Sequence, residues 1–358
     1  MDIFIKDNNT MDTVAILDTF KSLIWTERYA SYGDFELYTF VDKDLISCVT
    51  KDRYLVLNKS DRGMIVEDIL IDTEVEDGSF VTISGRSLES ILTRRIVWGQ
   101  TIVSGNLQDA VRVLLNNNVI SPTDPDRKID NFIFEESTDP AILGITVDAQ
   151  FTGDELYEAI KSLCDAHDIG FKVVLNDSNQ FVFSLYSGKD RTYNQTENPY
   201  VIFSPKFDNM ISSRYLTSKK SLKNVTLVAG EGEGADRRTV TVGSARGLSR
   251  REIFTDAKDV SSTVDNGTLS DEEYSAQLEQ RGLTKLAENI EVESFDAEVD
   301  ATVMFRYGEH FFMGDIVQIS NEYGNEGTAR VTELIRSESE EGINVYPTFN
   351  MIEQEEET

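Results

Sequence analysis

The sequence predicts a β-rich α+β protein, and three patterns support this prediction. Residues 295–305 alternate apolar and polar side chains, which is typical of a strand with one buried face. Residues 107–115 carry apolar side chains at helical spacing. Asp77-Gly78, a turn dipeptide, separates the apolar runs 64–71 and 80–83 and predicts a hairpin. We therefore expect mainly strands at both ends of the chain and more helix in the middle.

The composition indicates a globular and strongly acidic protein. The 358 residues are 40% hydrophobic and 27% charged, which suggests two or three folded domains. There are 34 lysines and arginines against 64 aspartates and glutamates, for a net charge of −30. Such a chain repels nucleic acid and anionic membrane surfaces. Solubility alone is the other explanation of this charge.

The cysteines and the N-terminal segment favour a protein made in a reducing cytoplasm. Cys48 and Cys164 are far apart and too few to hold a chain of this length together, so we expect both to be reduced and buried. The N-terminal segment is acidic where a signal peptide would be basic. No apolar run approaches the roughly 20 residues that span a bilayer, so we expect no stable membrane insertion.

The patterns divide the chain into three domains and a tail. Residues 1–98 form a first β domain, in which a strand at 53–58 and the 64–83 hairpin precede a short helix within 83–96. Residues 99–205 form an inserted α+β domain, residues 206–350 form a second β domain with one helix, and residues 351–358 form an acidic tail. Strands from both ends of the chain are free to pair with one another.

Capping residues locate three helices. Asn106 is the expected N-cap of the 107–115 helix, and Thr152 with Glu155 predicts a capping box for a helix that ends before Gly170. A hairpin of residues 171–175 and 181–185 follows. In the last domain, Ser270 and Glu273 predict a second capping box. The expected apolar face of that helix consists of Leu283, Leu286, Ala287 and Ile290. The strands expected in this part of the chain are 223–229, 295–305, 315–320, 328–336 and 343–349.

We predict no catalytic, cofactor-binding or metal-binding residues. Cys164 and His167 have a metal-ligand spacing, but both continue the apolar stripe of a helix, so core packing explains them better. The glycine-rich loop 230–238 carries acidic side chains that would repel a phosphate. The acidic loop 124–131 lacks the glycine and the closing glutamate of a calcium loop. We therefore expect a protein that is not an enzyme.

Several segments, taken in order, resemble a known family of siphophage tail proteins. They cover nearly the whole chain, from about residue 25 to 350, and their ordered set is more specific than any one of them. The segments are RYASYGDFELYTF (28–40), ISGRSLESILTRRI (83–96), VIFSPKFDNM (201–210), KNVTLVAGEGEG (223–234), GLSRREIF (247–254), QRGLTKLAE (280–288) and YGEHFFMGDIVQI (307–319).

The resemblance is to the baseplate hub that forms the N-terminal part of tail-associated lysins, and it is similar to the hub of T-even contractile baseplates. It implies two hub-type β-barrel domains per chain, separated by the inserted α+β domain, in a ring-forming homotrimer. The implied partners are a distal tail or tail-tube protein and receptor-binding or tail-fibre proteins, with phage DNA passing through without specific binding. The implied location is the tail tip of the virion.

The resemblance also marks residues expected to have structural roles. They are Arg28, Tyr29, Gly33, Asp34, Phe35, Glu36, Leu37, Gly85, Arg86, Arg251, Glu252, Gly282, Gly314 and Asp315. We further hypothesise that Asp296, Glu298 and Asp300, on the polar face of the alternating strand, line the lumen of the ring. A solvated outer face is an equally open interpretation of these three residues.

Two other functions remain open from the sequence. The first is a tail-associated cell-wall hydrolase, which would need paired carboxylates in a cleft. Tail-associated lysins often append such a domain after the hub, and we expect any such activity to reside in another protein or in a portion of chain outside this sequence. The second is a host-surface carbohydrate-binding module, in which Tyr193, Tyr200 and Tyr215 would stack on sugars.

Overall fold

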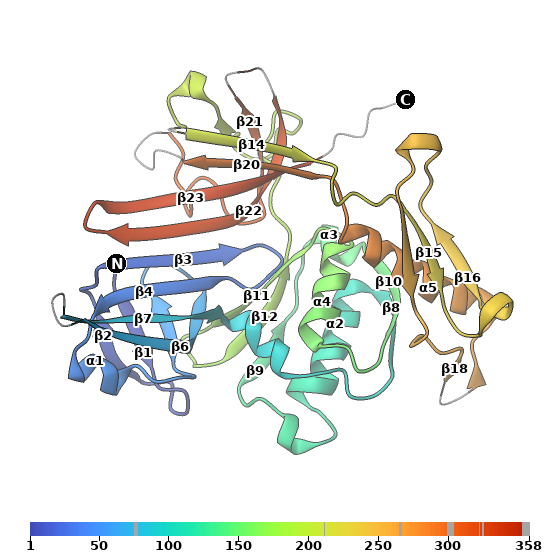
Figure 1. The fold of residues 1–358 in the computed structure, drawn as a ribbon, viewed down its shortest axis with the longest axis horizontal. Helices are drawn as coiled ribbons and strands as arrows, with labels where there is room; N and C mark the ends of the chain where they lie inside the picture. The colour runs from blue at the N-terminus through green and yellow to red at the C-terminus, as the bar shows by residue number, and fades with distance from the viewer. Residues whose placement is uncertain are drawn as a thin grey trace. The chain divides into compact units, whose positions relative to one another are not determined.

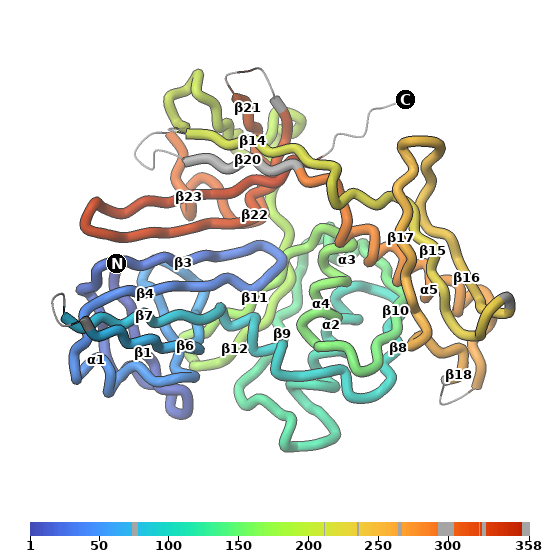
Figure 2. Tube along the Cα trace, viewed as in Figure 1, coloured from blue at the N-terminus to red at the C-terminus, as the bar shows by residue number. Residues whose placement is uncertain are grey.

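The fold is that of a computed structural model, which describes residues 1–74, 78–210, 212–264, 267–298, 304–321, 323 and 326–352 (Figures 1 and 2). The chain forms two compact units, and each is built from separate stretches of sequence. Unit 1 comprises residues 1–91, 171–215 and 294–358, and unit 2 comprises residues 92–170 and 216–293. Among the described residues, no helix is both long and apolar enough to span a membrane.

Unit 1 is dominated by strands. Its N-terminal elements are β1 (Ile3–Lys6), β2 (Thr13–Leu17), β3 (Ser22–Arg28), β4 (Asp34–Phe40), α1 (Lys43–Cys48), β5 (Tyr54–Leu57), β6 (Gly63–Glu74) and β7 (Gly78–Ser87). Its later elements are β11 (Gly170–Leu175), β12 (Phe181–Tyr186), β13 (Ile202–Phe203), a 3-10 turn (Pro205–Phe207), β14 (Ser212–Ser218), β20 (Val292–Glu298), β21 (Ile316–Ser320), β22 (Glu326–Ser339) and β23 (Gly342–Met351).

Thirteen strands of unit 1 form one sheet, whose main path runs in the order β14-β20-β23-β22-β3-β4-β7-β6-β5-β1-β2, while β11 and β12 lie outside this sheet. β21 pairs with both β22 and β13, off this path. β22 lies antiparallel to β3, so the C-terminal strands continue the N-terminal sheet (Figure 2). The sequence left open whether strands from the two ends of the chain pair, and the structure shows that they do.

Two separate hydrophobic cores lie in unit 1. The first belongs to the N-terminal strands and the second to the later ones, because apolar side chains alternate inward along each strand. The first core includes Ile3, Trp25, Phe35, Leu37, Leu55, Val66 and Ile83. The second core includes Tyr29, Phe203, Phe311, Val317, Val331 and Phe349.

The predicted hairpin of the runs 64–71 and 80–83 is confirmed, because β6 and β7 pair antiparallel. The predicted short helix within 83–96 is confirmed, as a 3-10 helix that covers part of this range. β7 continues to Ser87, and a 3-10 helix then spans Leu88–Arg94. Leu88 and Leu92 are fully buried, so the predicted apolar face is correct although the turn is tighter.

Unit 2 contains most of the helices. Its first stretch holds β8 (Thr101–Asn106), α2 (Leu107–Leu115), a π-turn (Asn116–Ile120), a 3-10 turn (Pro125–Arg127), β9 (Phe132–Glu135), α3 (Pro140–Leu143), β10 (Thr146–Phe151) and α4 (Leu156–Asp165). Its second stretch holds β15 (Val225–Ala229), a 3-10 turn (Gly234–Asp236), β16 (Thr239–Val242), a 3-10 turn (Gly247–Ser249), β17 (Glu252–Asp256), β18 (Thr263–Val264), β19 (Gly267–Thr268) and α5 (Asp271–Ala287).

The sheets of unit 2 are small. β8 pairs antiparallel with β10, and β15 lies between β16 and a parallel β17. The helix α5 packs on the second of these sheets (Figure 1), with Tyr274 and Leu278 in a core that includes Val228 and Val242. A short hairpin of β18 and β19 precedes α5.

Two of the three predicted helix caps are confirmed. The Asn106 side chain accepts the Gln108 amide at 2.9 Å, and Ser270 forms a full capping box with Glu273. The Thr152–Glu155 box is wrong. Glu155 is itself the N-cap of α4 and has no side-chain cap bond, because the Asp154 carboxylate accepts the Thr152 amide at 2.8 Å and fixes a tight turn there.

Two predictions near residue 290 also differ from the structure. Leu283 and Ile290 of the expected apolar face are 48% and 60% exposed, whereas Tyr274 and Leu278 face the core. Gly282 lies on the same face of α5 as Tyr274 and Leu278 and lets that face approach the sheet, and Leu286 of the expected face packs against the same core. Of the predicted alternating strand 295–305, residues 295–298 belong to β20, residues 299–303 lie outside the described part of the chain, and Met304 and Phe305 are not in a strand.

The units do not follow the predicted domain limits. β11 and β12, expected in the inserted domain, belong to unit 1, and residues 216–293, expected in the last domain, complete unit 2. Side-chain contacts explain the second difference. Arg281 of α5 lies 3.8 Å from Asp154, and the Gln150 amide bonds the Asp259 carbonyl at 3.4 Å.

Candidate functional site

Arg28 bonds residues of both the N-terminal and the C-terminal strands of unit 1. Its guanidinium donates to Asp34 Oδ2 at 2.6 Å, to Glu333 Oε2 at 2.6 Å, and to the Tyr32 carbonyl at 3.1 Å. Burial acts to lower the pKa of Arg28, but its bonds and charge interactions with the two carboxylates raise it. The predicted Arg28–Asp34 segment thus ties β3 and β4 to β22.

Gly33 and Gly85 are required by close backbone packing. A Cβ on Gly33 would lie 1.9 Å from the Thr26 carbonyl oxygen, and one on Gly85 would lie 1.9 Å from the Ile65 carbonyl oxygen. Gly85 faces a β-bulge, since the β6–β7 register shifts between Val66 and Asp68. Both glycines allow neighbouring backbones to approach more closely than any side chain permits.

Arg86 holds the same bulge from the other side. It forms two 2.7 Å bonds with the Glu67 carboxylate, and its guanidinium lies 5.1 Å from the Tyr32 ring. The Glu67 bond raises the pKa of Arg86 despite partial burial, so the guanidinium stays charged. Phe35 and Leu37 lie in the first core and Glu36 is exposed, as alternation along β4 requires.

A buried ion-pair cluster, formed by Arg62, Glu89, Ser87 and Tyr186, lies next to these residues in unit 1. Arg62 pairs with Glu89, and both are almost fully buried. Glu89 also accepts the Ser87 hydroxyl and, at 3.0 Å, the Val173 amide. Arg62 donates to the Tyr186 hydroxyl at 2.8 Å. Every partner needed to keep two charges in a dry interior is therefore present.

For both Tyr186 and Arg62 in this cluster, the effect of burial on the pKa is opposed by the effect of neighbouring charges. Burial raises the pKa of Tyr186, although Arg62 opposes the shift, so its hydroxyl remains protonated. Burial acts to lower the pKa of Arg62, but Tyr186, Glu89 and Asp61 raise it. The sequence analysis missed this cluster. Its one local signal is Glu89, a charged residue within the apolar run of residues 88–92.

Gly314 and Asp315 order the loop before β21. Gly314 has φ +89°, and a Cβ there would lie 2.5 Å from the Tyr29 ring. The Asp315 carboxylate accepts Arg191 Nε at 2.5 Å, the Lys189 amide at 2.7 Å and the Phe312 amide at 3.0 Å. Gly314 thus packs against Tyr29 of the second core, although the two residues lie far apart along the chain.

The remaining family-motif residues lie in unit 2. Arg251 donates to the Lys219 carbonyl at 2.6 Å, and Glu252 pairs with Arg250 at 2.5 Å. A Cβ on Gly282 would lie 2.5 Å from Val242 Cγ2, so this glycine lets α5 rest on the sheet. The structure therefore divides the marked residues between the two units.

The proposed lumen residues cannot be placed in full. Asp296 and Glu298 belong to β20, where Asp296 pairs with Thr348 of β23, but their side chains lie outside the described part of the structure. Asp300 lies outside it altogether. Of the tyrosines proposed to bind sugars, Tyr193 and Tyr200 are exposed and lie edge to face at 6.1 Å, and Tyr215 is half-buried in β14.

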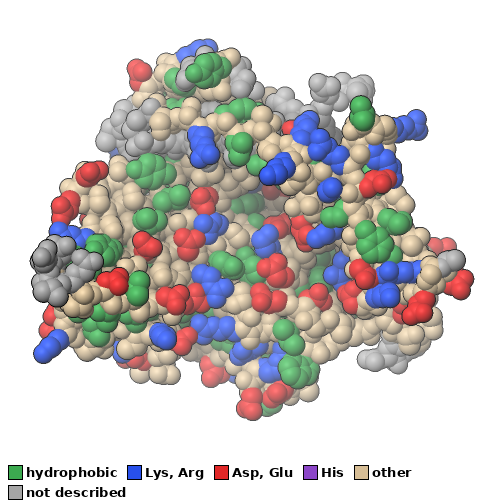
Figure 3. All heavy atoms as spheres, viewed as in Figure 1, with side chains coloured by type: hydrophobic (Ala, Val, Ile, Leu, Met, Phe, Trp, Pro, Cys, Tyr) green, Lys and Arg blue, Asp and Glu red, His purple; other side chains and the backbone are tan. Residues whose placement is uncertain are grey.

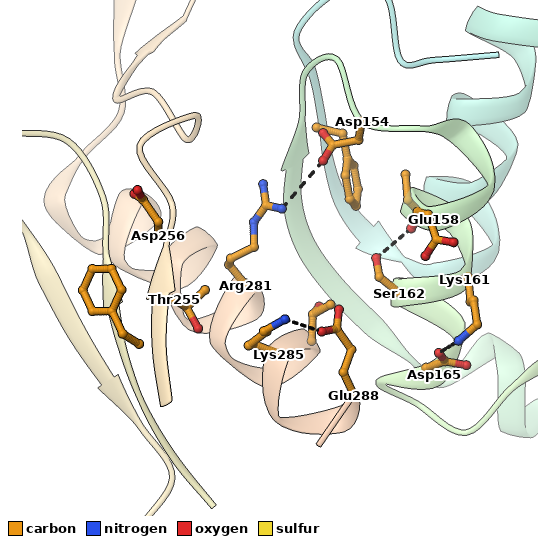
Figure 4. Close-up of a pocket in the computed structure, with 14 residues that line it drawn as sticks. Asp154, Glu158, Lys161, Ser162, Asp165, Thr255, Asp256, Arg281, Lys285 and Glu288 are labelled. Atoms are coloured by element: carbon orange, nitrogen blue, oxygen red, sulfur yellow. Dashed lines mark hydrogen bonds and ion pairs between the residues drawn. The ribbon is translucent and has the colours of Figure 1, made fainter. Parts of the chain in front are cut away.

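A groove of about 400 Å³ lies between α4, α5 and β17 in unit 2 (Figure 4). Its charged side chains are mostly paired with each other. Lys161 pairs with Asp165, Lys285 with Glu288 at 2.6 Å, and Arg281 with Asp154 at 3.8 Å. Burial raises the pKa of Asp165 and also that of Glu158. The sequence analysis did not single out this groove.

The metal-ligand spacing at Cys164 has a structural explanation. Cys164 lies on the buried face of α4, and burial raises the pKa of its thiol. His167 lies beyond the end of α4, and desolvation lowers its pKa. Among the described residues, no group of three histidines, cysteines or carboxylates is arranged to hold a metal ion.

Solved structures of phage tail proteins have the same architecture. A 43 kDa tail protein of prophage MuSo2 from Shewanella oneidensis matches with a TM-score of 0.59 at 13% identity, over 98% of each chain. The prophage tail protein gp18 from Listeria monocytogenes EGD-e matches with a TM-score of 0.56 at 14% identity, over 99% of this chain and 96% of that one. The Francisella PdpA–VgrG complex, in its lidded form, matches with a TM-score of 0.50 at 10% identity, over 99% of this chain and 54% of that one.

The fold is thus one that solved phage tail proteins share. No curated protein matches the sequence significantly. The chain belongs to the family of siphovirus ReqiPepy6 Gp37-like proteins, whose family model matches residues 1–349. The resemblance to siphophage tail proteins is therefore confirmed.

Proposed function

We propose that the chain is a structural hub of the phage tail tip, which assembles as a homotrimer and has no catalytic centre of its own. It closes or extends the tail tube, joins it to the receptor-binding apparatus and opens for passage of DNA. The ion pairs and hydrogen bonds of unit 1 support this function, because they join its strands to one another. They leave their charged groups paired with one another.

The two hydrophobic cores of unit 1 support the proposed pair of barrel domains. Each core belongs to a different half of the sheet, and the β3–β22 pairing joins the halves. Three copies with two such domains each would imitate a six-fold ring. Such a ring matches a hexameric tail tube, and closed cyclic contacts prevent open-ended growth.

The observation that carries the self-association proposal is the free edge of β2. This strand ends the sheet, so within the described strands one of its sides has no backbone partner. Val14 and Ile16 on β2 are 41% and 58% exposed. An uncovered edge with apolar side chains is a template for pairing with another chain. We propose that a neighbouring copy covers it.

The net negative charge of the chain supports a passage through which DNA moves without binding. Three copies at −30 each would carry −90. Acidic and basic side chains are interspersed on the face shown in Figure 3. We propose that the excess negative charge includes Asp296, Glu298 and Asp300 on the lumen side, where it would keep phosphates from binding.

Further chains complete the proposed assembly. The likeness to a complex that contains VgrG supports a place in a multi-chain tube or spike. The proposed partners are a distal tail or tail-tube protein and receptor-binding or tail-fibre proteins. Synthesis in the host cytoplasm precedes incorporation at the tail tip.

The first test is the mass of the purified chain by multi-angle light scattering. We expect a trimer, and we expect the double variant Val14→Lys/Ile16→Lys to be a folded monomer because two lysines cannot be buried at a pairing edge. Ile290→Lys, at an exposed apolar position of unit 2, is the matched control and should remain a trimer. A wild-type monomer at high concentration that binds no tail-tube protein would refute the proposal.

A further inference from the structure

An exposed tryptophan lies beside a cluster of arginines in unit 2. Trp98 is 71% exposed, in contrast to Trp25, which is fully buried in unit 1. Trp98 lines an open groove of about 350 Å³ together with Arg95, Ile96, Asp124, Asp126 and Arg127. A large aromatic side chain left in water on a soluble surface indicates a binding site more often than a packing defect.

The arginines of this groove are held in fixed positions by neutral acceptors. Arg127 donates to the Ile96 carbonyl at 2.6 Å and to Asn118 Oδ1 at 3.1 Å, and its guanidinium lies 5.1 Å from the Trp98 ring. Arg95 Nε donates to the Arg127 carbonyl at 2.9 Å. Asn118 Oδ1 also accepts the Trp98 amide at 3.3 Å. The tryptophan and both guanidinium groups are thus ordered before any ligand arrives.

Of the three arginines that line the groove, two form no ion pair among the described residues. Neither Arg95 nor Arg127 has a carboxylate within ion-pair distance there, although the chain has 64 acidic residues. Burial lowers the pKa of Arg95, and the neighbouring charges of Arg127 and Arg94 lower it further. Asp124 lies at the same groove, but its carboxylate caps the turn by accepting the Asp126 amide at 3.1 Å. An incoming anion would relieve the repulsion among the arginines.

We propose that this Trp98 groove docks an acidic segment of a partner protein. Carboxylates of that segment would bond the fixed guanidinium groups, and an apolar side chain would lie on the Trp98 ring. Tryptophan and arginine dominate the energetics of protein interfaces, and arginine suits planar carboxylates. The proposal concerns unit 2 alone and does not depend on the trimer.

Charge favours a protein segment over a nucleic acid in this groove. A nucleic acid would bring a phosphate at every nucleotide past Asp124 and Asp126, on a chain of net charge −30. An acidic peptide needs only one or two carboxylates at the arginines and can turn apolar side chains to the rest of the groove. The two ligands therefore form the two arms of the test.

The test measures binding of a fluorescein-labelled peptide of glutamate and leucine to the full chain by fluorescence anisotropy. The comparison ligands are the same peptide with glutamine in place of glutamate, and a single-stranded oligothymidylate of equal charge. The variants are Trp98→Ala, Trp98→Phe and Arg127→Gln. Lys128→Gln is the control, because Lys128 is an adjacent exposed cation paired with Asp130. Circular dichroism verifies that each variant is folded.

We expect the acidic peptide to bind and the glutamine peptide not to bind. Trp98→Ala and Arg127→Gln should each weaken binding about tenfold, the loss expected at an interface anchor, while Trp98→Phe and Lys128→Gln should stay near wild type. In the wild-type chain, the peptide should also shield Trp98 from quenching by acrylamide. Equal binding to all variants, no binding of the acidic peptide, or tighter binding of the oligothymidylate would each overturn the proposal.

Discussion

Individual buried charges decide how unit 1 holds together. Arg62 and Glu89 lie in the interior, where the cost of removing two charges from water is offset only by a complete set of partners. Arg28 also forms ion pairs with two carboxylates, but its side chain is partly exposed, so water weakens the contribution of these ion pairs to stability. We therefore expect the residues of the buried ion-pair cluster to be far more sensitive to substitution than the exposed ion pairs.

Glu89→Gln should destabilise unit 1 by about 3 kcal/mol, because it leaves the Arg62 charge buried without its counter-ion. The measurement is urea unfolding in a Trp98→Phe background, so that Trp25, in the first core, reports on unit 1. The double variant Arg62→Gln/Glu89→Gln should lose less than the two single variants together. Strictly additive losses would contradict a coupled pair. Lys21→Gln, which breaks the exposed pair with Glu340, should leave the unfolding midpoint unchanged.

Gly33→Ala should lower stability by about 3 kcal/mol, because its methyl group would overlap the Thr26 carbonyl oxygen and neither backbone can move freely. Thermal unfolding followed by circular dichroism measures the loss. Gly99→Ala is the control, since a Cβ there meets no atom within 4 Å. If both variants melt at the wild-type temperature, the close approach of β3 and the 33–34 segment is not as described.

At the scale of elements, α5 shows how a cap and a glycine cooperate. Ser270 and Glu273 satisfy backbone groups at its N-terminus, and the lowered pKa of Glu273 reflects its bond to the Ser270 amide. Gly282 then lets the helix approach β16. The cap fixes where the helix begins, while the glycine fixes which face meets the sheet.

Ser270→Ala should destabilise unit 2 by about 1 kcal/mol, the usual effect of removing an N-cap side chain. Ser270→Asp, which keeps an acceptor at the same position, should restore most of the loss. The measurement is thermal unfolding of the wild type and of both variants, followed at the helical circular dichroism band. A Ser270→Asp variant as unstable as Ser270→Ala would show that the cap bond does not carry the effect.

At the scale of the whole molecule, the central question is what covers the free edge of β2 and where the acidic charge lies. Sheets with uncovered edges are normally protected or paired. A trimer would bring three such edges into cyclic contacts and concentrate the negative charge around one axis. Rigid-body movement between subunits would then open the ring for DNA.

Reversal of the proposed lumen charge, by Asp296→Lys, Glu298→Lys and Asp300→Lys together, should slow DNA ejection from phage particles, because lysines would bind passing phosphates. The slowing should weaken as salt is raised. The control reverses three exposed acids of unit 2: Asp109, Glu136 and Asp130. Normal ejection and infectivity in the first variant would mean that the three residues form a solvated outer face instead.

The sequence by itself determined the local elements and the chemical character of the protein. The sequence patterns located the strands β21 and β23, and capping residues located the starts of α2 and α5. These features depend on neighbours within a few residues, which a sequence displays directly. The ordered family segments also predicted the class of phage tail protein, which the family match confirms.

Only the tertiary structure decided which elements meet. Alternation shows that one face of a strand is buried but not which strand lies beside it, so the β3–β22 pairing is invisible in the sequence. Arg28 and Glu333 are 305 positions apart and Arg62 and Tyr186 are 124 apart, yet both pairs bond. The assignment of residues 216–293 to unit 2 has the same origin. Hydrophobic burial and ion pairing act through space, so partners distant in sequence are fixed only when the chain folds.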